Sequence, residues 1–312
     1  MPKDENTDTK KAAPHGWIIL DKPRGLGSTQ AVGAVKRVLR EGGYAKTKVG
    51  HGGTLDPLAE GVLPIALGEA TKLAGRMLDA SKIYEFTIRF GEETDTLDTE
   101  GEIIDRSNVV PSHAEVESVL PRFAGPIEQV PPAFSALKVD GKRAYDLARA
   151  GEEVKLKTRA VTIHSLKTAD EGSSGEITLT AHVSKGTYIR SLARDIARAL
   201  GSCGHVTYLR RTKAGPFRES QAISLDKLNG MANGAQLSDL LLPLEAGLND
   251  IPALSLSQTD AQAVRQGRVL SGMPQSSGLY CATLDSVPIA LIEIKDGTAK
   301  VVRGFNLPDV AE

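Results

Sequence analysis

The segment that most restricts the fold of this chain is residues 50–64, GHGGTLDPLAEGVLP. It places His51, Asp56 and Glu60 among four glycines and two prolines. Glycine permits positive φ angles and close backbone approach, and Pro57 biases Asp56 away from the helical region. The segment is therefore predicted to be a loop that holds the Asp56 carboxylate between structured elements.

Two interpretations of this loop are open from the residues alone. Asp56 either makes an Asx-type turn or belongs to an active site. A nucleotide cofactor is not indicated, because no G-x-x-x-x-G-K-[ST] sequence occurs and G-H-G-G is too short for a dinucleotide fingerprint. A metal site is not indicated, since the histidines lack ligand spacing. A glycosidase would need a second carboxylate, for which Glu60 is the only nearby candidate.

The charge of the chain depends strongly on position. Its 38 Lys and Arg against 39 Asp and Glu leave a net charge of -1, which by itself argues against a nucleic-acid partner. Counted in blocks, residues 91–120 have a balance of −8, residues 131–220 of +7 and residues 221–312 of −4. The central stretch would suit a positive face for a phosphate backbone, and a patchwork of solvated charges is the simpler alternative.

Hydrophobicity and cysteine content favour a cytoplasmic protein. The chain is 40% hydrophobic, and no apolar run approaches the roughly 18 residues of a membrane span. Residues 1–16 are polar and without periodicity, which predicts a disordered tail and no signal core. Only Cys203 and Cys281 occur, too few for a disulfide framework or a cysteine metal cluster. We therefore expect a protein without membrane contact.

Hydrophobic periodicity predicts strands interspersed with helices. The helix expected at residues 188–200 places Arg190 nearest the edge of its apolar stripe. Strands are expected at residues 17–20, 84–90 and 177–183, and helices after an N-cap at Ser28, through residues 73–78 and after a capping box at Ser112.

Two further segments differ in composition from the rest. Residues 125–155 combine prolines and glycines with basic and aromatic side chains, which is typical of a mobile basic insertion. Beyond residue 250 the chain is rich in loops and short apolar runs, and Asp296-Gly297 is a strong hairpin signal. A small, mainly β module is therefore expected over residues 251–312.

Several motifs, in order along the chain, resemble those of the TruB family of pseudouridine synthases. GGTLDPLAEGVL is similar to the family's G-x-L-D-P-x-A-x-G-x-L motif. The other matching segments are DKP at 21–23 with Gly25 and Ser28, KIY at 82–84, QVPPAFSALK at 129–138, KGTYIR at 185–190 and YLRRT at 208–212. The resemblance covers about residues 17–220.

The resemblance implies an α+β fold, the pseudouridine synthase fold, with a mixed central β-sheet flanked by helices. After the tail at residues 1–16, residues 17–250 would form the catalytic domain, with residues 125–155 as a thumb-like insertion. Residues 251–312 are similar to a PUA-type module. The implied activity is isomerisation of uridine 55 in the T loop of tRNA, in which C1′ of the ribose exchanges its bond to N1 of uracil for one to C5. This reaction requires no metal and no organic cofactor.

Asp56 matches the single essential aspartate of the family. Whether it attacks C1′, attacks C6 of the ring or assists a glycal-like route stays open. Arg190 matches the arginine that pairs with this aspartate, and a guanidinium can hold a carboxylate ionised and aimed. The alternative is that Arg190 is one of three solvated arginines on its helix.

The resemblance also implies residues that bind the uridine. Tyr84 would stack on uracil, and Tyr188 and Leu209 would line its pocket; the alternative for all three is ordinary core packing. The target base must be flipped out of the T loop, and His51 would stack in the place it leaves. The alternative is a turn histidine bonded to nearby backbone.

The thumb-like insertion would bind the RNA backbone and not take part in the chemistry. The partner implied is tRNA, with no obligatory protein partner, and the chain would be a monomer. One rival function is a synthase that depends on guide RNA and partner proteins, and another is an RNA-folding chaperone, which could also be a second role. The residues expected on the RNA backbone are Lys138, Lys142, Arg143 and Arg149.

Overall fold

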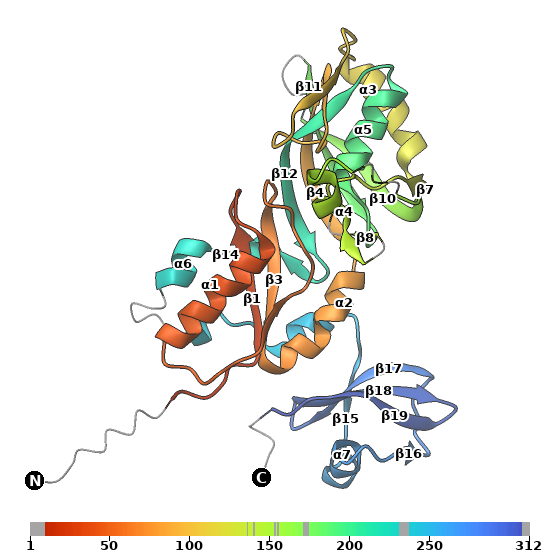
Figure 1. Ribbon diagram of the computed structural model, residues 1–312. Helices are drawn as coiled ribbons and strands as arrows, with labels where there is room; N and C mark the ends of the chain where they lie inside the picture. Colours follow the sequence, from red (N-terminus) through yellow and green to blue (C-terminus); the bar gives the residue numbers. More distant parts are fainter. Residues whose placement is uncertain are drawn as a thin grey trace, which may run out of the picture.

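The computed structural model describes residues 10–135, 137–139, 141–152, 154, 156–170, 175–230 and 237–307. Two separate main sheets organise this part of the chain. A large mixed sheet forms the body, and a smaller one forms the C-terminal module, which Figure 1 shows below the body. Residues 1–9 of the expected tail lie outside the described residues.

The large sheet has ten strands: β1 (Gly16–Lys22), β2 (Val49–His51), β3 (Glu60–Leu67), β4 (Lys82–Phe90), β7 (Gly125–Gln129), β10 (Arg159–Asp170), β11 (Glu176–Val183), β12 (Gly204–Ala214), β13 (Phe217–Arg218) and β14 (Ile223–Ser224). Their order is β14-β1-β3-β12-β4-β11-β10-β7, with β2 on β3 and β13 on β12. The β1–β14 and β3–β12 pairs are parallel and the others antiparallel. Strand β12 therefore joins the two halves of the sheet.

Helices cover one face of this sheet. The apolar residues of α1 (Ser28–Glu41), α3 (His113–Val119) and α5 (Ile189–Ala199) form one core with the inward side chains of the strands. Trp17 and Ile19 alternate with the core residues of β1, so they face the other side and pack there on Leu73 and Leu244. The remaining helical segments are η1 (Gly68–Leu73), α2 (Ala74–Asp79), η2 (Leu120–Phe123), α4 (Ala144–Arg149), η3 (Glu219–Gln221), α6 (Leu225–Gly230), η5 (Leu237–Asp239) and η6 (Leu244–Leu248).

The C-terminal module is a five-stranded sheet with one helix. It contains β15 (Ala253–Ser255), α7 (Gln258–Arg265), β16 (Leu270–Ser271), β17 (Gly278–Leu284), β18 (Val287–Lys295) and β19 (Thr298–Gly304), in the order β15-β17-β18-β19-β16. Asp296 and Gly297 both have positive φ angles between β18 and β19, which confirms the predicted hairpin. Two short hairpins, β5 (Glu92–Thr94) with β6 (Ile103–Arg106) and β8 (Lys138–Val139) with β9 (Lys142–Arg143), complete the strands.

This architecture confirms the predicted α+β class, with a mixed central sheet, flanking helices and a β-rich C-terminal module. The strands expected at residues 17–20, 84–90 and 177–183 are present, and so is the helix expected at 188–200, as α5. Ser112 caps α3 with Glu115 in the predicted capping box. The likeness of the module to a PUA domain stays a prediction.

Three local predictions were wrong. Ser28 does not cap α1, because Gly27 is the N-cap and the Ser28 hydroxyl instead bonds the backbone of Leu55. Strand β3 runs through Gly61 and Pro64 where a loop was expected, since its residues from 61 to 67 are buried from both sides. The insertion does not begin at residue 125, because β7 pairs with β10 in the large sheet.

The expected disordered tail is shorter than residues 1–16. The Lys11 N–H donates to the Gly43 oxygen at 2.9 Å, and the Lys11 oxygen accepts from Ala45 at 2.8 Å. His15 Nδ1 accepts from the Glu69 N–H at 3.0 Å, and β1 begins at Gly16. Backbone pairing of this kind needs no apolar pattern, which is why the polar sequence did not predict it.

Strand β3 approaches β12 so closely that Gly61 has no room for a side chain. Its φ is +100°, and an added Cβ would lie 2.3 Å from the Arg211 oxygen. We expect Gly61→Ala to lower the free energy of unfolding by about 2–5 kcal/mol through backbone strain and overpacking. Urea unfolding measures this change. In Gly50→Ala, where the added Cβ meets open space, we expect a change below about 1 kcal/mol; equal losses in the two variants would contradict the argument.

Candidate active site

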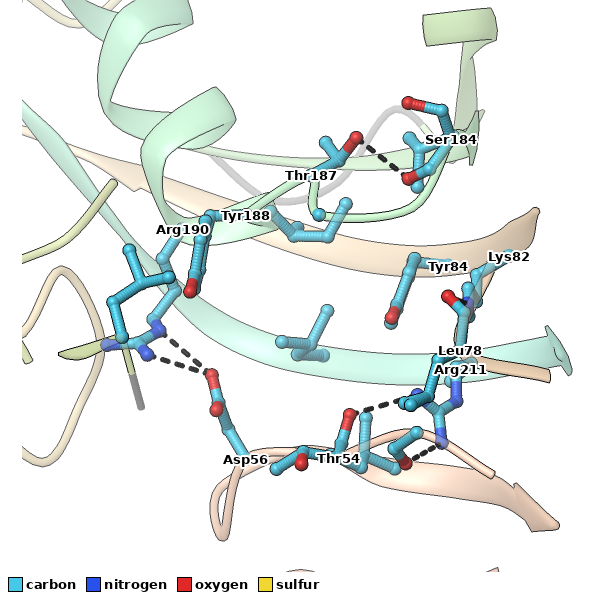
Figure 2. A pocket seen from close by; sticks show the side chains of 17 residues that line it. Thr54, Asp56, Leu78, Lys82, Tyr84, Ser184, Thr187, Tyr188, Arg190 and Arg211 are labelled. Atoms are coloured by element: carbon cyan, nitrogen blue, oxygen red, sulfur yellow. Dashed lines mark hydrogen bonds and ion pairs between the residues drawn. The ribbon is translucent and has the colours of Figure 1, made fainter. Parts of the chain in front are cut away.

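A cavity of about 350 Å³ opens where the loop before β3 faces β4, β12 and the start of α5. Figure 2 shows its side chains. Asp56 lies on the loop, and the cavity is also lined by Tyr84, Tyr188, Arg190 and Leu209. The structure therefore brings together five of the residues proposed from the sequence, from four separate segments.

The Asp56 loop is tied to the body at both of its ends. The Ser28 hydroxyl donates to the Leu55 oxygen and accepts from the Leu55 N–H, both at 2.9 Å. The fully buried Lys22 ammonium donates to the Pro57 oxygen at 3.3 Å, and the Gly25 N–H donates to the same oxygen at 2.7 Å. Contacts on each side of Asp56 thus hold the backbone of the loop in place.

Asp56 pairs with Arg190. Nε and Nη2 of Arg190 lie 3.1 and 2.9 Å from the same carboxylate oxygen, Oδ2 of Asp56. The Arg190 side chain is 6% exposed and that of Asp56 is 36% exposed, so the cation is buried while the carboxylate meets the cavity. The alternative of a solvated arginine is excluded by this burial.

Arg190 is itself held from its other side. Nη1 donates to the Thr96 oxygen at 2.7 Å, and Nη2 donates to the Phe134 oxygen at 3.0 Å. A second carboxylate, the buried Asp98, lies 3.4 Å from Nη1. Because two carboxylates and two carbonyls surround it, the guanidinium can adopt few other positions, and its orientation toward Asp56 is set before any substrate arrives.

Tyr84 and Leu209 are at once core and cavity residues. Tyr84 packs partly buried against the main core beside Phe86, and Leu209 is a buried member of the same core. Both also line the cavity. Core packing and a place in the uridine pocket are therefore not exclusive for these residues, because side chains at the edge of the core also line the cavity.

Tyr188 is positioned by Gln129, the last residue of β7. The Tyr188 N–H donates to Oε1 of Gln129 at 2.8 Å, and Nε2 of Gln129 donates back to the Tyr188 oxygen at 3.1 Å. Burial raises the pKa of the Tyr188 hydroxyl, so Tyr188 is neutral at pH 7. A neutral phenol beside Asp56 can act as a hydrogen-bond donor.

His51 lies at the end of β2 and does not line the cavity. Its Nδ1 accepts from the Gly53 N–H at 3.4 Å, which is the contact expected of a turn histidine. Burial and the Arg211 charge lower its pKa, so the ring is neutral at pH 7. The ring is partly exposed, and its stacking role stays a prediction.

The residues expected on the RNA backbone lie on the β8–β9 hairpin and α4. Lys142 and Arg149 are exposed, and the Arg149 guanidinium lies 4.8 Å from the centre of the Tyr145 ring. The side chains of Lys138 and Arg143 lie outside the described part of the structure. Within the described ranges, no three His, Cys, Asp or Glu side chains gather as metal ligands do.

Sequence reasoning missed several residues that build this site. The Asp56 loop is bonded by Lys22 and Arg211. Asp98 contacts Arg190, and Gln129 bonds Tyr188. Apart from Asp98, these residues lie in the motifs quoted above, but the motifs gave them no role. Asp98 was counted within the acidic block at residues 91–120. A buried acid there had no local signal, because burial depends on the fold.

Two family models match consecutive parts of this chain. The N-terminal domain of TruB family pseudouridylate synthases matches residues 39–189, and the tRNA pseudouridylate synthase B C-terminal domain matches residues 190–249. A protein of Novosphingobium aromaticivorans named tRNA pseudouridine synthase B is 67% identical over 301 residues, which cover 95% of this chain and 99% of that protein. The chain belongs to the TruB family. It is therefore a pseudouridine synthase, an isomerase.

A second relative supports the same family, and two solved structures share the fold. A Caulobacter vibrioides protein with the same name is 47% identical over 96% of this chain and 98% of its own length. A chain in an H/ACA ribonucleoprotein bound to a substrate RNA has a TM-score of 0.71 at 24% identity, covering 99% of this chain and 95% of its own. A chain of a Cbf5-Nop10-Gar1 complex has a TM-score of 0.70 at 25% identity, covering 98% and 94%.

These matches confirm the predicted pseudouridine synthase fold. The two family models together span residues 39–249, and the relatives cover nearly the whole chain. Among the described residues, no helix is long and apolar enough to cross a membrane.

Proposed function

We propose that this enzyme converts uridine to pseudouridine at position 55 in the T loop of tRNA. Its relatives are named for tRNA pseudouridylation. The observation that carries the proposal is the cavity in which a partly exposed carboxylate, Asp56, is held by the buried guanidinium of Arg190. A cavity of this size accepts a uracil ring, and one aimed carboxylate is sufficient for an isomerisation without redox change or net water.

Asp56 is the proposed catalytic residue. The hydrogen bond from Nε of Arg190 and the ion-pair contact from its Nη2 both go to Oδ2, and Oδ1 accepts no hydrogen bond from the described residues. Oδ1 is thus available for the ribose or the base. Attack on C1′, attack on C6 and a glycal-like route all begin with this ionised oxygen.

The uridine enters the cavity only after it leaves the T loop, at a cost of a few kcal/mol in lost stacking. In the proposed complex Tyr84 stacks on the uracil ring, and Tyr188 and Leu209 close its pocket. His51, outside the cavity and partly exposed, stacks in the place that the base leaves.

The exposed cations of the insertion are proposed to bind RNA phosphates. We expect the variant Lys142→Ala/Arg149→Ala to bind a T-stem-loop more weakly, with the slope of log Kd against log salt reduced by about 1–2, since each lost phosphate contact removes about 0.9. Filter binding between low and moderate salt measures this slope. Lys36→Ala, on the exposed face of α1, is the control and should keep the slope; a loss of rate at saturating RNA in the double variant would contradict a role in binding alone.

The proposed function is tested by mapping pseudouridine in tRNA treated with the purified chain. One pseudouridine per tRNA, at position 55, is the expected result. Because the pure chain is used, this result also supports an enzyme that needs no guide RNA and no other protein. Modification elsewhere, or only with an added guide RNA, would contradict it.

A second, non-catalytic role as a tRNA-folding chaperone is compatible with the same cleft. It would need RNA binding by the insertion but not the carboxylate of Asp56. The expected sign of this role is that Asp56→Asn rescues a tRNA-folding defect in cells to the level of the wild type. Absence of rescue would contradict the role.

A further inference from the structure

The end of the cavity opposite Asp56 is lined by two buried cations. Figure 2 shows Asp56 and Arg190 on one side, Lys82 and Arg211 on the other, and Tyr84 between them. Lys82 is 7% exposed and Arg211 is 1% exposed. Neither was given a role by the motifs, and the mechanism above does not use them.

Neither cation has an acidic partner within 4 Å among the described residues. The Lys82 ammonium donates its three hydrogens to the oxygens of Met77, Leu78 and Ala80, at 2.9, 2.7 and 2.6 Å. Asp79 attracts it from farther away, but that carboxylate is exposed and pairs with Lys185. Buried charges are usually paired, so two neighbouring ones without a carboxylate are unusual.

Arg211 uses only part of its donor capacity. Nε donates to the Val62 oxygen at 2.8 Å, and the two Nη atoms donate to the oxygens of Thr54 and Gly53 at 3.1 and 3.2 Å. A guanidinium has five N–H groups, so two remain without a partner in the described chain. Burial and Arg211 together lower the pKa of Lys82 to about 8, the response expected of a cation without an anion beside it.

The proposed reaction moves negative charge from Asp56 onto the base, which in the proposed complex lies in the cavity that the two cations also line. When the bond between C1′ and N1 breaks, its electron pair stays on uracil, which becomes an anion. The sugar becomes neutral either by bonding an Asp56 oxygen at C1′ or by giving its C2′ proton to Asp56. If Asp56 instead attacks C6, the charge is delocalised over the ring toward O4. In all three routes one negative charge leaves Asp56 and arrives on the base.

We propose that Lys82 and Arg211 form an anion-stabilising wall, which stabilises the negative charge that uracil acquires in the reaction. This inference rests on the proposed function. The wall is fixed before the reaction and largely shielded from water, so its field acts where charge develops. The base later returns its electron pair to C1′ through C5, which makes the base neutral and gives the negative charge back to the Asp56 carboxylate. The C5 proton then leaves and N1 gains a proton, so pseudouridine is neutral.

The test compares uridine with 5-fluorouridine in the same T-stem-loop. Fluorine withdraws electrons and stabilises the uracil anion by itself, so it should replace part of what the wall supplies. Because fluorine occupies the place of the C5 proton, the measurement is loss of the N-glycosidic bond in a single turnover, after quenching in denaturant. The variants are Lys82→Met and Lys82→Gln. Glutamine can still donate to two of the three carbonyls, so Lys82→Gln is used if Lys82→Met does not fold.

Lys82→Met is expected to lose about 100-fold in this rate on uridine and about tenfold or less on 5-fluorouridine, with RNA affinity unchanged. Lys22→Met is the matched control, because Lys22 is an equally buried lysine that donates to three carbonyls but does not line the cavity. It should lose the same factor on both substrates.

An equal loss of rate on both substrates in the Lys82 variants would contradict the proposed stabilisation of the uracil anion, and it would indicate a purely structural role for Lys82. The failure of the proposed function is distinguishable, because in that case the wild type would form no pseudouridine from the uridine RNA. A wild type that is active on uridine, with variants insensitive to fluorine, contradicts this inference alone.

Discussion

Asp56→Asn is expected to abolish pseudouridine formation, with a single-turnover rate lower by about 10⁴-fold or more. The amide has the size of the carboxylate but can neither form the bond to the sugar or base nor take its proton. Arg190 keeps its contacts with Asp98, Thr96 and Phe134 in this variant, so the cavity should keep its shape. Tritium release from a 5-tritiated uridine T-stem-loop measures the rate, and filter binding should show an unchanged Kd.

The control is Glu60→Gln. Glu60 is the neighbouring carboxylate. It pairs with Arg210 at a distance of 3.1 Å, and it does not line the cavity. Its variant should keep the rate within about threefold, as expected for a partly exposed ion pair worth at most about 1 kcal/mol. A loss comparable to that of Asp56→Asn would instead indicate two catalytic carboxylates, and a wild-type rate in Asp56→Asn would overturn the proposed mechanism.

Arg190→Lys is expected to reduce the rate by about 10²–10³-fold. An ammonium keeps the charge but cannot reach Oδ2 of Asp56, Asp98 and the two carbonyls at once, so Asp56 loses its orientation. Buried acceptors left without donors should also lower the free energy of unfolding by about 1–3 kcal/mol. Single-turnover kinetics and urea unfolding measure the two effects.

Arg198→Lys is the matched control on the same helix. Arg198 has an exposed side chain and a single ion pair, to Glu93 at 2.8 Å, which a lysine can also make. The rate should be unchanged. If Arg190→Lys were as active as Arg198→Lys, the orientation of Asp56 by a guanidinium would not matter for the reaction.

The acidic block at residues 91–120 gains a role from the structure. By sequence it only cancelled the basic stretch in the net charge. In the fold, Asp98 contacts Arg190, and Glu93 pairs with Arg198, so two buried acids of this block hold two arginines of α5. We expect raised salt to weaken tRNA binding despite the near-neutral total charge, because the exposed cations of the insertion would bind RNA phosphates.

Local patterns predicted the elements well where one face of each is buried. The alternation of Phe86, Ile88 and Phe90 identified β4, and the stripe of Ile189, Leu192 and Ile196 identified α5, because a period of 2 or 3.6 is a local property. Strand β3 was missed because it is buried on both faces and so shows no alternation. The ordered segment at residues 10–15 was missed because backbone pairing leaves no trace in side chains.

The sequence alone determined the family, the catalytic candidate Asp56 and the class of reaction, because motif residues keep their order and identity along the chain. Tertiary structure decided which of these residues meet. Asp56 and Arg190 are 134 positions apart and pair only because β12 joins the two halves of the sheet. Burial of Asp98, Lys82 and Arg211 likewise depends on packing between distant segments. A buried charge acts more strongly on a neighbouring reaction than an exposed one, because the effective dielectric constant around it is lower than in water.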